Sequence, residues 1–258
     1  MKKTIVFVHG MFQTNKSWEK WVNFFNEKGF HCMAPAWPLH EGEPSALRNN
    51  PPADLGDLRL NDVVAHIEQL VTGLPERPIV IGHSVGGLIV QLLANKDLIS
   101  LGVPINSVAP NAMLSFDWDF FKNSVKIANP FKGDEPFEMN AEGFHDAFAN
   151  TLSKEEAAAE FEKSAVHDSR NVLRDCMMEY GHVDLEKQHA PLLFISGHED
   201  HIIPYELVEK NSKAYDENSG ISDYKDFEGR SHYICAEPGW EEVATHVYNW
   251  IQSQSNNM

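Results

Sequence analysis

Short apolar runs alternate with segments whose apolar residues recur at helical spacing, and this alternation constrains the fold of the 258-residue chain more than any other feature. It predicts an α/β fold, a mostly parallel sheet with helices on both faces. Apolar and β-branched runs bounded by turn residues are typical of strands. Six such runs are predicted as strands: residues 4–8, 30–34, 78–81, 105–109, 192–196 and 223–227.

The helices between these runs have recognisable ends and faces. The first should begin near Asn15 or Ser17 and end at Gly29, because glycine is favoured directly after a helix C-terminus. Apolar residues of 60–71 recur at the spacing of an amphipathic helix. Residues 88–93 are apolar nearly all round, which predicts a buried helix.

Two stretches depart from the alternation. Residues 38–57 are rich in proline and glycine and predict a long irregular loop, which we expect at the mouth of a site because such loops are often functional. Residues 111–190 contain no convincing strand and carry many phenylalanines, so they must bury apolar surface against the sheet domain, against themselves or around an apolar ligand. We interpret them as a helical cap inserted into a core domain of residues 1–110 and 191–258. Residues 155–161 of this insertion are strongly helix-forming.

Charge and cysteine content argue against several classes of protein. The formal net charge is −17 and no basic stripe is present, so we expect neither a nucleic-acid partner nor an anionic membrane surface. Strongly anionic substrates are mildly disfavoured for the same reason. The three cysteines are odd in number and show no C-x-x-C spacing, which argues against a disulfide framework or a cysteine zinc site.

Hydropathy gives no sign of a membrane protein. No run of about 18 apolar residues exists, so no membrane span is predicted. The apolar run at residues 5–8 is too short for the core of a signal peptide. We therefore expect a soluble, cytoplasmic protein.

The pentapeptide Gly82-His83-Ser84-Val85-Gly86 matches G-x-S-x-G and lies between a predicted strand and a predicted buried helix. This context is the one in which a serine nucleophile sits on a tight, strained turn. A side chain at position 82 or 86 would collide with neighbouring backbone. The alternative is a glycine-rich turn that binds phosphate, but the glycines form no G-x-G-x-x-G pattern and no G-K-[ST] follows. We therefore favour Ser84 as a nucleophile.

A nucleophilic serine needs a base, and the base needs an acceptor that fixes its orientation. His232 follows the last predicted strand, so it should lie at the sheet edge where open α/β sheets place ligands. Asp200 follows the fifth predicted strand and is the expected acceptor, with Glu199 as a competitor. A metal site at His198, Asp200 and His201 is disfavoured because their spacing matches no zinc motif.

Acyl transfer also needs two N–H donors for the developing oxyanion. The N–H of Val85 follows the nucleophile and is expected to be one of them. The second should come from the loop after the first strand, where Gly10 lets the backbone approach the site closely. Met11 is the first choice and Phe12 the second.

Four segments of the chain resemble the α/β-hydrolase superfamily in order and spacing. They are H-G at 9–10, G-H-S-V-G-G at 82–87, G-H-E-D at 197–200 and G-R-S-H at 229–232. More narrowly, the chain is similar to its small cap-bearing serine esterases, lactonases and cofactor-free haloperoxidase-like members. The order Ser84, Asp200, His232 is the one associated with that superfamily. Members often have two antiparallel strands before the H-G strand. Here that strand starts within five residues of Met1, so we expect a trimmed sheet of about six strands.

The resemblance implies a serine hydrolase without cofactor or metal. Its expected reaction is the cleavage of carboxylic esters through an acyl-enzyme on Ser84, and the aromatic insertion predicts mainly apolar acyl substrates. A lactonase, for example one acting on acyl-homoserine lactones, is the main alternative because it needs the same residues. A ligand receptor with little turnover is a further alternative. A serine at position 84 argues against the dehalogenases and epoxide hydrolases of the superfamily, which use an aspartate there.

Overall fold

The computed structural model describes residues 2–111, 113 and 126–255, and contains a six-stranded parallel sheet of order β2-β1-β3-β4-β5-β6. The predicted parallel α/β architecture of about six strands is confirmed. Each strand pairs in parallel with its neighbours, as in the register Val6 to Val80 and Ile81 to Val103. The strands are β1 Thr4–Val8, β2 His31–Met33, β3 Ile79–His83, β4 Leu101–Ile105, β5 Leu192–Gly197 and β6 Ser222–Phe227.

Helices and short helical turns connect the strands. The α-helices are α1 Glu19–Glu27, α2 Pro44–Asn49, α3 Leu60–Thr72, α4 Val85–Asn95, α6 Ala141–Gly143, α7 Lys154–Ser164, α8 Arg170–Cys176, α9 Tyr205–Lys213 and α10 Trp240–Ser255. The shorter turns are 3₁₀ helices at Asn15–Trp18, Leu55–Asp57, Pro130–Lys132 and Glu179–Gly181, and a π-helical turn at Phe144–Phe148.

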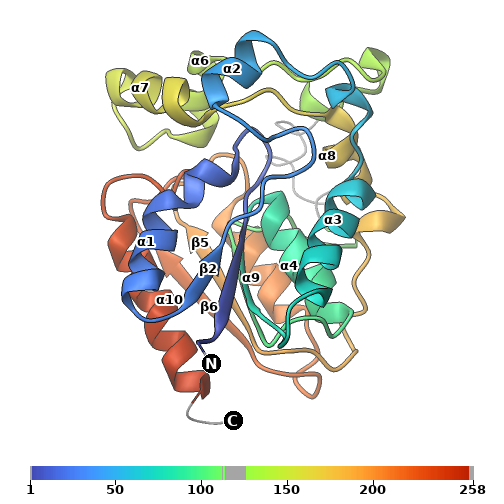
Figure 1. Cartoon of the computed structure of the whole chain (residues 1–258), viewed down its shortest axis with the longest axis vertical. Helices are drawn as coiled ribbons and strands as arrows, with labels where there is room; N and C mark the ends of the chain where they lie inside the picture. The colour runs from blue at the N-terminus through green and yellow to red at the C-terminus, as the bar shows by residue number, and fades with distance from the viewer. Residues whose placement is uncertain (1, 112, 114–125, 256–258) are drawn as a thin grey trace.

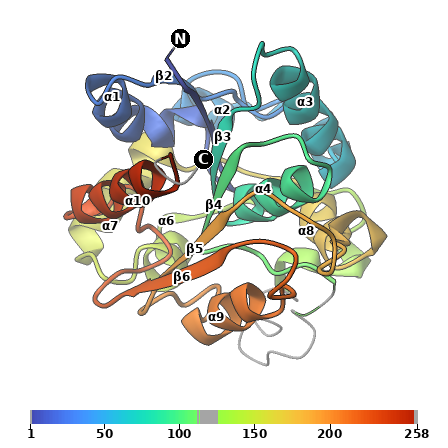
Figure 2. The same cartoon turned by 90° about the horizontal axis from the view of Figure 1, so that it is seen from below.

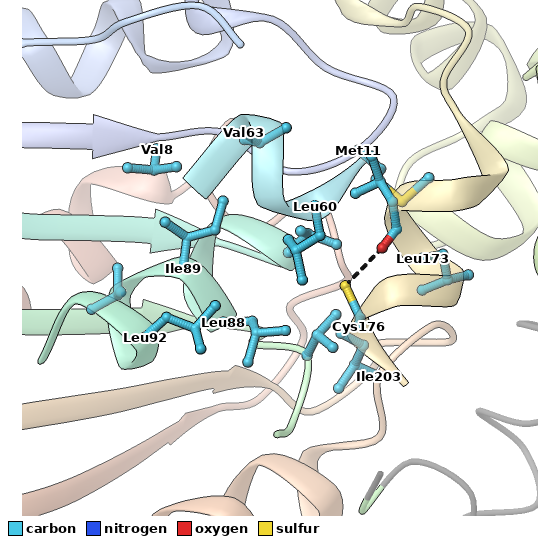
Figure 3. Packing of buried hydrophobic residues seen from close by; sticks show 14 of the residues in the cluster. Val8, Met11, Leu60, Val63, Leu88, Ile89, Leu92, Leu173, Cys176 and Ile203 are labelled. Carbon is cyan, nitrogen blue, oxygen red and sulfur yellow. Dashed lines mark hydrogen bonds between the residues drawn. The ribbon is translucent and has the colours of Figure 1, made fainter. Parts of the chain in front are cut away.

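Two hydrophobic cores lie on opposite faces of the sheet because successive side chains of a strand point to opposite faces. In β1, Ile5 and Phe7 pack toward α1 and α10, whereas Val6 and Val8 pack toward α3 and α4. Figure 2 shows the two pairs of helices on opposite sides of the sheet. Figure 3 shows residues of α3 and α4 on the face of Val6 and Val8, in one cluster with Met11, Leu173 and Ile203.

The fourth strand lies at Leu101–Ile105, so its prediction at residues 105–109 was wrong by about four residues. Gly102 and Pro104 weaken a strand pattern, since proline lacks an N–H and glycine has no side chain to pack. Residues 106–109 are buried but leave the extended conformation at Asn106, whose φ is +43°. Residues 106–109 resemble a strand in the sequence because they are buried, not because they are extended.

Two segments before β3 can be compared with their predictions. The first helical segment begins at Asn15, as predicted, and its cap is Thr14, whose side chain accepts a hydrogen bond from Lys16 N–H. Residues 38–57 are not irregular throughout, because α2 and a 3₁₀ turn lie within them. Proline at the first position of α2 favours the start of a helix, although proline elsewhere suggests a loop.

The chain between β4 and β5 contains α6, α7 and α8 and, among its described residues, no strand of the sheet. In Figure 1, α2, α6 and α7 lie together beyond the ends at which the strands stop. Phe144 and Phe148 are buried, but Phe131 is 96% exposed and does not follow the expectation of burial. The aromatic residues Phe116, Trp118, Phe120 and Phe121 lie outside the described part of the chain.

Candidate active site

Ser84 occupies the turn between β3 and α4 with φ +57° and ψ −119°, a backbone conformation that non-glycine residues seldom adopt. Such a residue costs on the order of 1–3 kcal/mol and persists only where the surroundings hold it. Ser84 N–H donates to Ile105 O at 2.9 Å, and Ser84 O accepts from Gly87 N–H at 2.9 Å. The neighbouring strand and the first turn of α4 therefore fix the serine in this conformation.

The glycines on either side of Ser84 are required by space. A Cβ atom at Gly82 would lie 2.1 Å from Gly86 O, and one at Gly86 would lie 2.2 Å from Val8 O. Both obstacles are backbone atoms, which cannot rotate away as a flexible side chain can. The predicted collision with backbone at positions 82 and 86 is confirmed.

His232 and Asp200 meet at the carboxyl end of the sheet. His232 Nδ1 lies 2.6 Å from Asp200 Oδ2, and the two side chains are 1% and 0% exposed. The other carboxylate oxygen, Asp200 Oδ1, accepts N–H bonds from Ile202 at 2.7 Å and Ile203 at 2.9 Å. Glu199, the competing acceptor, is exposed to solvent. With Nδ1–H donating to Asp200, His232 Nε2 is the nitrogen left to act as a base.

The loop that carries His232 is held by three residues that the sequence did not single out for this role. Glu237, 2% exposed, accepts from Ser231 N–H at 3.1 Å and from Ser231 Oγ at 2.8 Å. Asn106 Nδ2 donates to Ser231 O at 3.1 Å, and His83 Nε2 lies 2.8 Å from His232 O. Burial lowers the pKa of His83 well below its usual value, so its neutral ring donates to that carbonyl.

Ser84 and His232 open into the same pocket, which has a volume of about 450 Å³. Met11, Phe12 and Val85 also line it, so all the residues predicted for the site except Asp200 reach this one cavity. Its wall combines apolar side chains with a few charged ones: Val108, Ile127, Phe137, Met139, Ala147, Phe148, Leu173, Ile202 and Ile203 with Lys126, Glu142 and Asp146.

The loop after β1 places two possible N–H donors beside the pocket, and their N–H groups differ. Phe12 N–H donates to Asp168 Oδ2 at 2.9 Å and is therefore engaged. Neither Met11 N–H nor Val85 N–H bonds to an acceptor among the residues that the structure describes. Gly10 brings this loop close to the serine, because a Cβ atom there would lie only 2.7 Å from Ser84 Cβ.

The orientation of the Gly10–Met11 peptide is fixed by His9. Trp37 N–H donates to His9 Nε2 at 3.1 Å, so the neutral ring carries its proton on Nδ1, which lies 2.9 Å from Gly10 O. Burial, with a smaller contribution from His40, lowers the pKa of His9 to about 3 and keeps the ring neutral. Because a peptide unit is planar, holding its oxygen on one side directs the Met11 N–H to the other.

The residues of the alternative metal site face different partners. His198 Nδ1 lies 2.6 Å from Asp226 Oδ2, His201 Nδ1 lies 3.1 Å from Asp146 O, and Asp200 holds His232. Within residues 2–111, 113 and 126–255, no group of three or more histidine, cysteine, aspartate or glutamate side chains is arranged to hold a metal ion. No described helix is long and apolar enough to cross a membrane.

A family model described as the alpha/beta hydrolase family matches residues 5–245, almost the whole chain. The chain belongs to this family. A comparison with curated protein sequences gives no match for this α/β hydrolase. Solved structures share its fold at low sequence identity. At these identities the similarity shows the fold alone.

Three of these structures illustrate the similarity. The monoacylglycerol lipase of Paleococcus ferrophilus is 22% identical, with a TM-score of 0.71 and coverage of 97% of this chain and 94% of the lipase. Polyneuridine aldehyde esterase is 16% identical, with a TM-score of 0.66 and coverage of 96% and 99%. A methylesterase from Arabidopsis is 15% identical, with a TM-score of 0.68 and coverage of 99% and 100%.

Proposed function

We propose that this α/β hydrolase is a serine hydrolase that cleaves carboxylic esters with mainly apolar acyl groups. The observation that carries the proposal is the opening of Ser84 and the Asp200-bound His232 into one pocket beside the N–H groups of Met11 and Val85. The same fold occurs in solved structures of two esterases and a lipase, which is consistent with ester cleavage.

In the proposed reaction, His232 Nε2 takes the proton of Ser84 as Oγ bonds to the ester carbonyl carbon. The Met11 and Val85 N–H groups stabilise the oxyanion of the tetrahedral intermediate. His232 then gives its proton to the leaving alcohol as the carbon–oxygen bond breaks. Water, deprotonated by His232, attacks the acyl-enzyme, and release of the acid returns the proton to Ser84.

We further propose that residues 111–190 act as a cap that forms the acyl-binding wall over the core of residues 1–110 and 191–258. The ring of Phe148 in this segment packs edge-on against the His232 ring, with 4.7 Å between the ring centroids. The centroids of the Phe137 and Phe12 rings lie 5.4 Å apart. Met139 and Leu173 of the same segment also line the pocket. An acyl chain in contact with these residues would leave water, which favours apolar acyl groups.

A fluorophosphonate probe tests the serine chemistry. It should label the wild-type protein at Ser84 and leave Ser84→Ala unlabelled, whereas equal labelling of both would contradict the proposal. Turnover of p-nitrophenyl esters compared with a panel of lactones then identifies the class of acyl substrate. Labelling of Ser84 without turnover of either class would instead indicate a ligand receptor.

A further inference from the structure

Asp168 is a buried carboxylate of the segment between β4 and β5, and it contacts the loop that carries the proposed oxyanion donor. Its side chain is 0% exposed. Oδ2 accepts the Phe12 N–H at 2.9 Å, and Oδ1 accepts the Ser169 N–H at 2.7 Å. Burying a carboxylate without partners is strongly unfavourable, so these bonds and a nearby cation are needed to hold it there.

His40 is the basic side chain paired with this carboxylate. Its Nε2 lies 3.3 Å from Asp168 Oδ2, and its side chain is 1% exposed. Its Nδ1 lies 3.0 Å from Pro38 O, an atom that can only accept, so Nδ1 carries a proton. A neutral ring with its proton there would present a lone pair to the carboxylate, whereas the imidazolium presents a second N–H. Although burial opposes the charge, Asp168 raises the pKa of His40 above its usual value.

The backbone around Asp168 holds the same loop from its other side. Val166 N–H donates to Phe12 O at 3.0 Å, so both peptide groups of Phe12 are bonded to residues 166–168. The backbone of Asp168 pairs in both directions with Phe137, at 2.8 and 3.1 Å. Phe12 has φ +64°, a left-handed conformation that a bulky residue keeps only where its surroundings impose it.

We propose that Asp168, charged and paired with His40, is a positioning residue for the hydrolytic reaction. Its carboxylate fixes the Met11–Phe12 peptide, while His9 fixes the Gly10–Met11 peptide that precedes it. The Met11 N–H is thereby kept facing Ser84, and the Phe12 N–H is turned away from the oxyanion. This inference rests on the proposed ester hydrolysis and adds a residue that does not touch the substrate.

The chain offers a matched control for a test. Asp175 is a second fully buried carboxylate of the same segment, and it also pairs with a basic side chain and a backbone N–H. Its Oδ2 accepts from Arg59 Nε at 2.9 Å and from Leu60 N–H at 3.2 Å, and Leu60 begins α3 and does not line the pocket. Asp175→Asn thus disturbs a comparable buried pair without touching the oxyanion loop.

The experiment measures kcat, KM and the affinity for a trifluoromethyl ketone, which forms an oxyanion on the serine. Asp168→Ala should lower kcat and the affinity for the ketone together, by about 10- to 100-fold, with KM within about twofold. Asp168→Asn should lose less, because its amide oxygen can still accept the Phe12 N–H. Asp175→Asn should keep both quantities near the wild-type values even where it lowers the melting temperature.

Several outcomes would overturn the positioning role. One is that Asp168→Ala and Asp168→Asn lower kcat no more than Asp175→Asn does; another is that they raise KM while leaving the affinity for the ketone unchanged. If Asp168→Ala does not fold, Asp168→Asn and His40→Gln carry the test, each with a smaller expected loss in kcat. If the wild-type protein hydrolyses esters and the Asp168 variants are fully active as well, only the positioning role is contradicted. Wild-type protein without ester turnover contradicts both proposals.

Discussion

Ser84 and the Met11–Phe12 peptide line the same pocket, but different parts of the chain hold them. Ser84 is fixed by the adjacent strand and by its own helix, through Ile105 O and Gly87 N–H. The loop of Met11 and Phe12 is fixed by Asp168, 156 residues further along the chain. The proposed nucleophile therefore depends on the sheet, whereas the loop of the proposed oxyanion donor depends also on the segment between β4 and β5. Substitutions on the two sides should consequently differ in what they damage.

The largest effect is expected at the base. Asp200→Asn should lower kcat for ester hydrolysis by about 10⁴-fold, because an amide cannot hold His232 in the tautomer with a basic Nε2. The matched control is Glu199→Gln, at the exposed neighbouring carboxylate, which should keep nearly full activity. Steady-state kinetics of both variants checks the assignment, and a larger loss in Glu199→Gln than in Asp200→Asn would reverse it.

The next effect concerns the stability of the turn at Ser84. Gly86→Ala should lower the free energy of unfolding by about 1–3 kcal/mol or more, because its Cβ atom would lie 2.2 Å from Val8 O. Gly73→Ala is the control, since its Cβ atom would meet nothing closer than 3.4 Å at the end of α3. Denaturant unfolding of the two variants gives the comparison. Equal stability of both would mean that the close approach of β1 to the turn is not a constraint.

The smallest effect is a pH dependence on the oxyanion side. The pKa of His9 is about 3 in the folded protein, below its value of about 6.5 in an unfolded chain. Between these pH values the unfolded chain binds the extra proton, so the stability that His9 contributes is present above pH 6.5 and lost as the pH falls. From pH 6.5 to 5, the free energy of unfolding should fall by about 1–2 kcal/mol more in the wild-type protein than in His9→Asn. Unfolding curves that shift in parallel would contradict a neutral buried His9.

Much of the fold, and the placement of the proposed catalytic residues at one edge of the sheet, could be predicted from the sequence because those signals are local. The G-x-S-x-G turn, the strand before it and the apolar helix after it are contiguous, and the structure brings His232 and Asp200 together as their positions after two strands predicted. The fourth strand was misplaced because Gly102 and Pro104 are unusual in a strand, whereas the buried residues that follow the strand have a strand-like pattern.

The supports of the site could not be predicted for the opposite reason. Asp168, His40 and Glu237 act through contacts with residues far from them in the sequence or through loop geometry, and no spacing rule describes such contacts. The raised pKa of His40 depends on a carboxylate more than a hundred residues away, and in the sequence His40 is one of thirteen histidines. A buried carboxylate beside a buried histidine becomes visible only when the chain is folded.

Trapping the acyl-enzyme tests the proposed role of Ser84 most directly. Wild-type protein mixed with an excess of a p-nitrophenyl ester of a medium-length acid is quenched in acid within the first turnovers, and its peptides are analysed by mass spectrometry. Acyl transfer through Ser84 predicts one acyl group on the peptide that contains Ser84, and none in Ser84→Ala. Ester turnover without an adduct on Ser84, or an adduct on another residue at the same occupancy in Ser84→Ala, would contradict it.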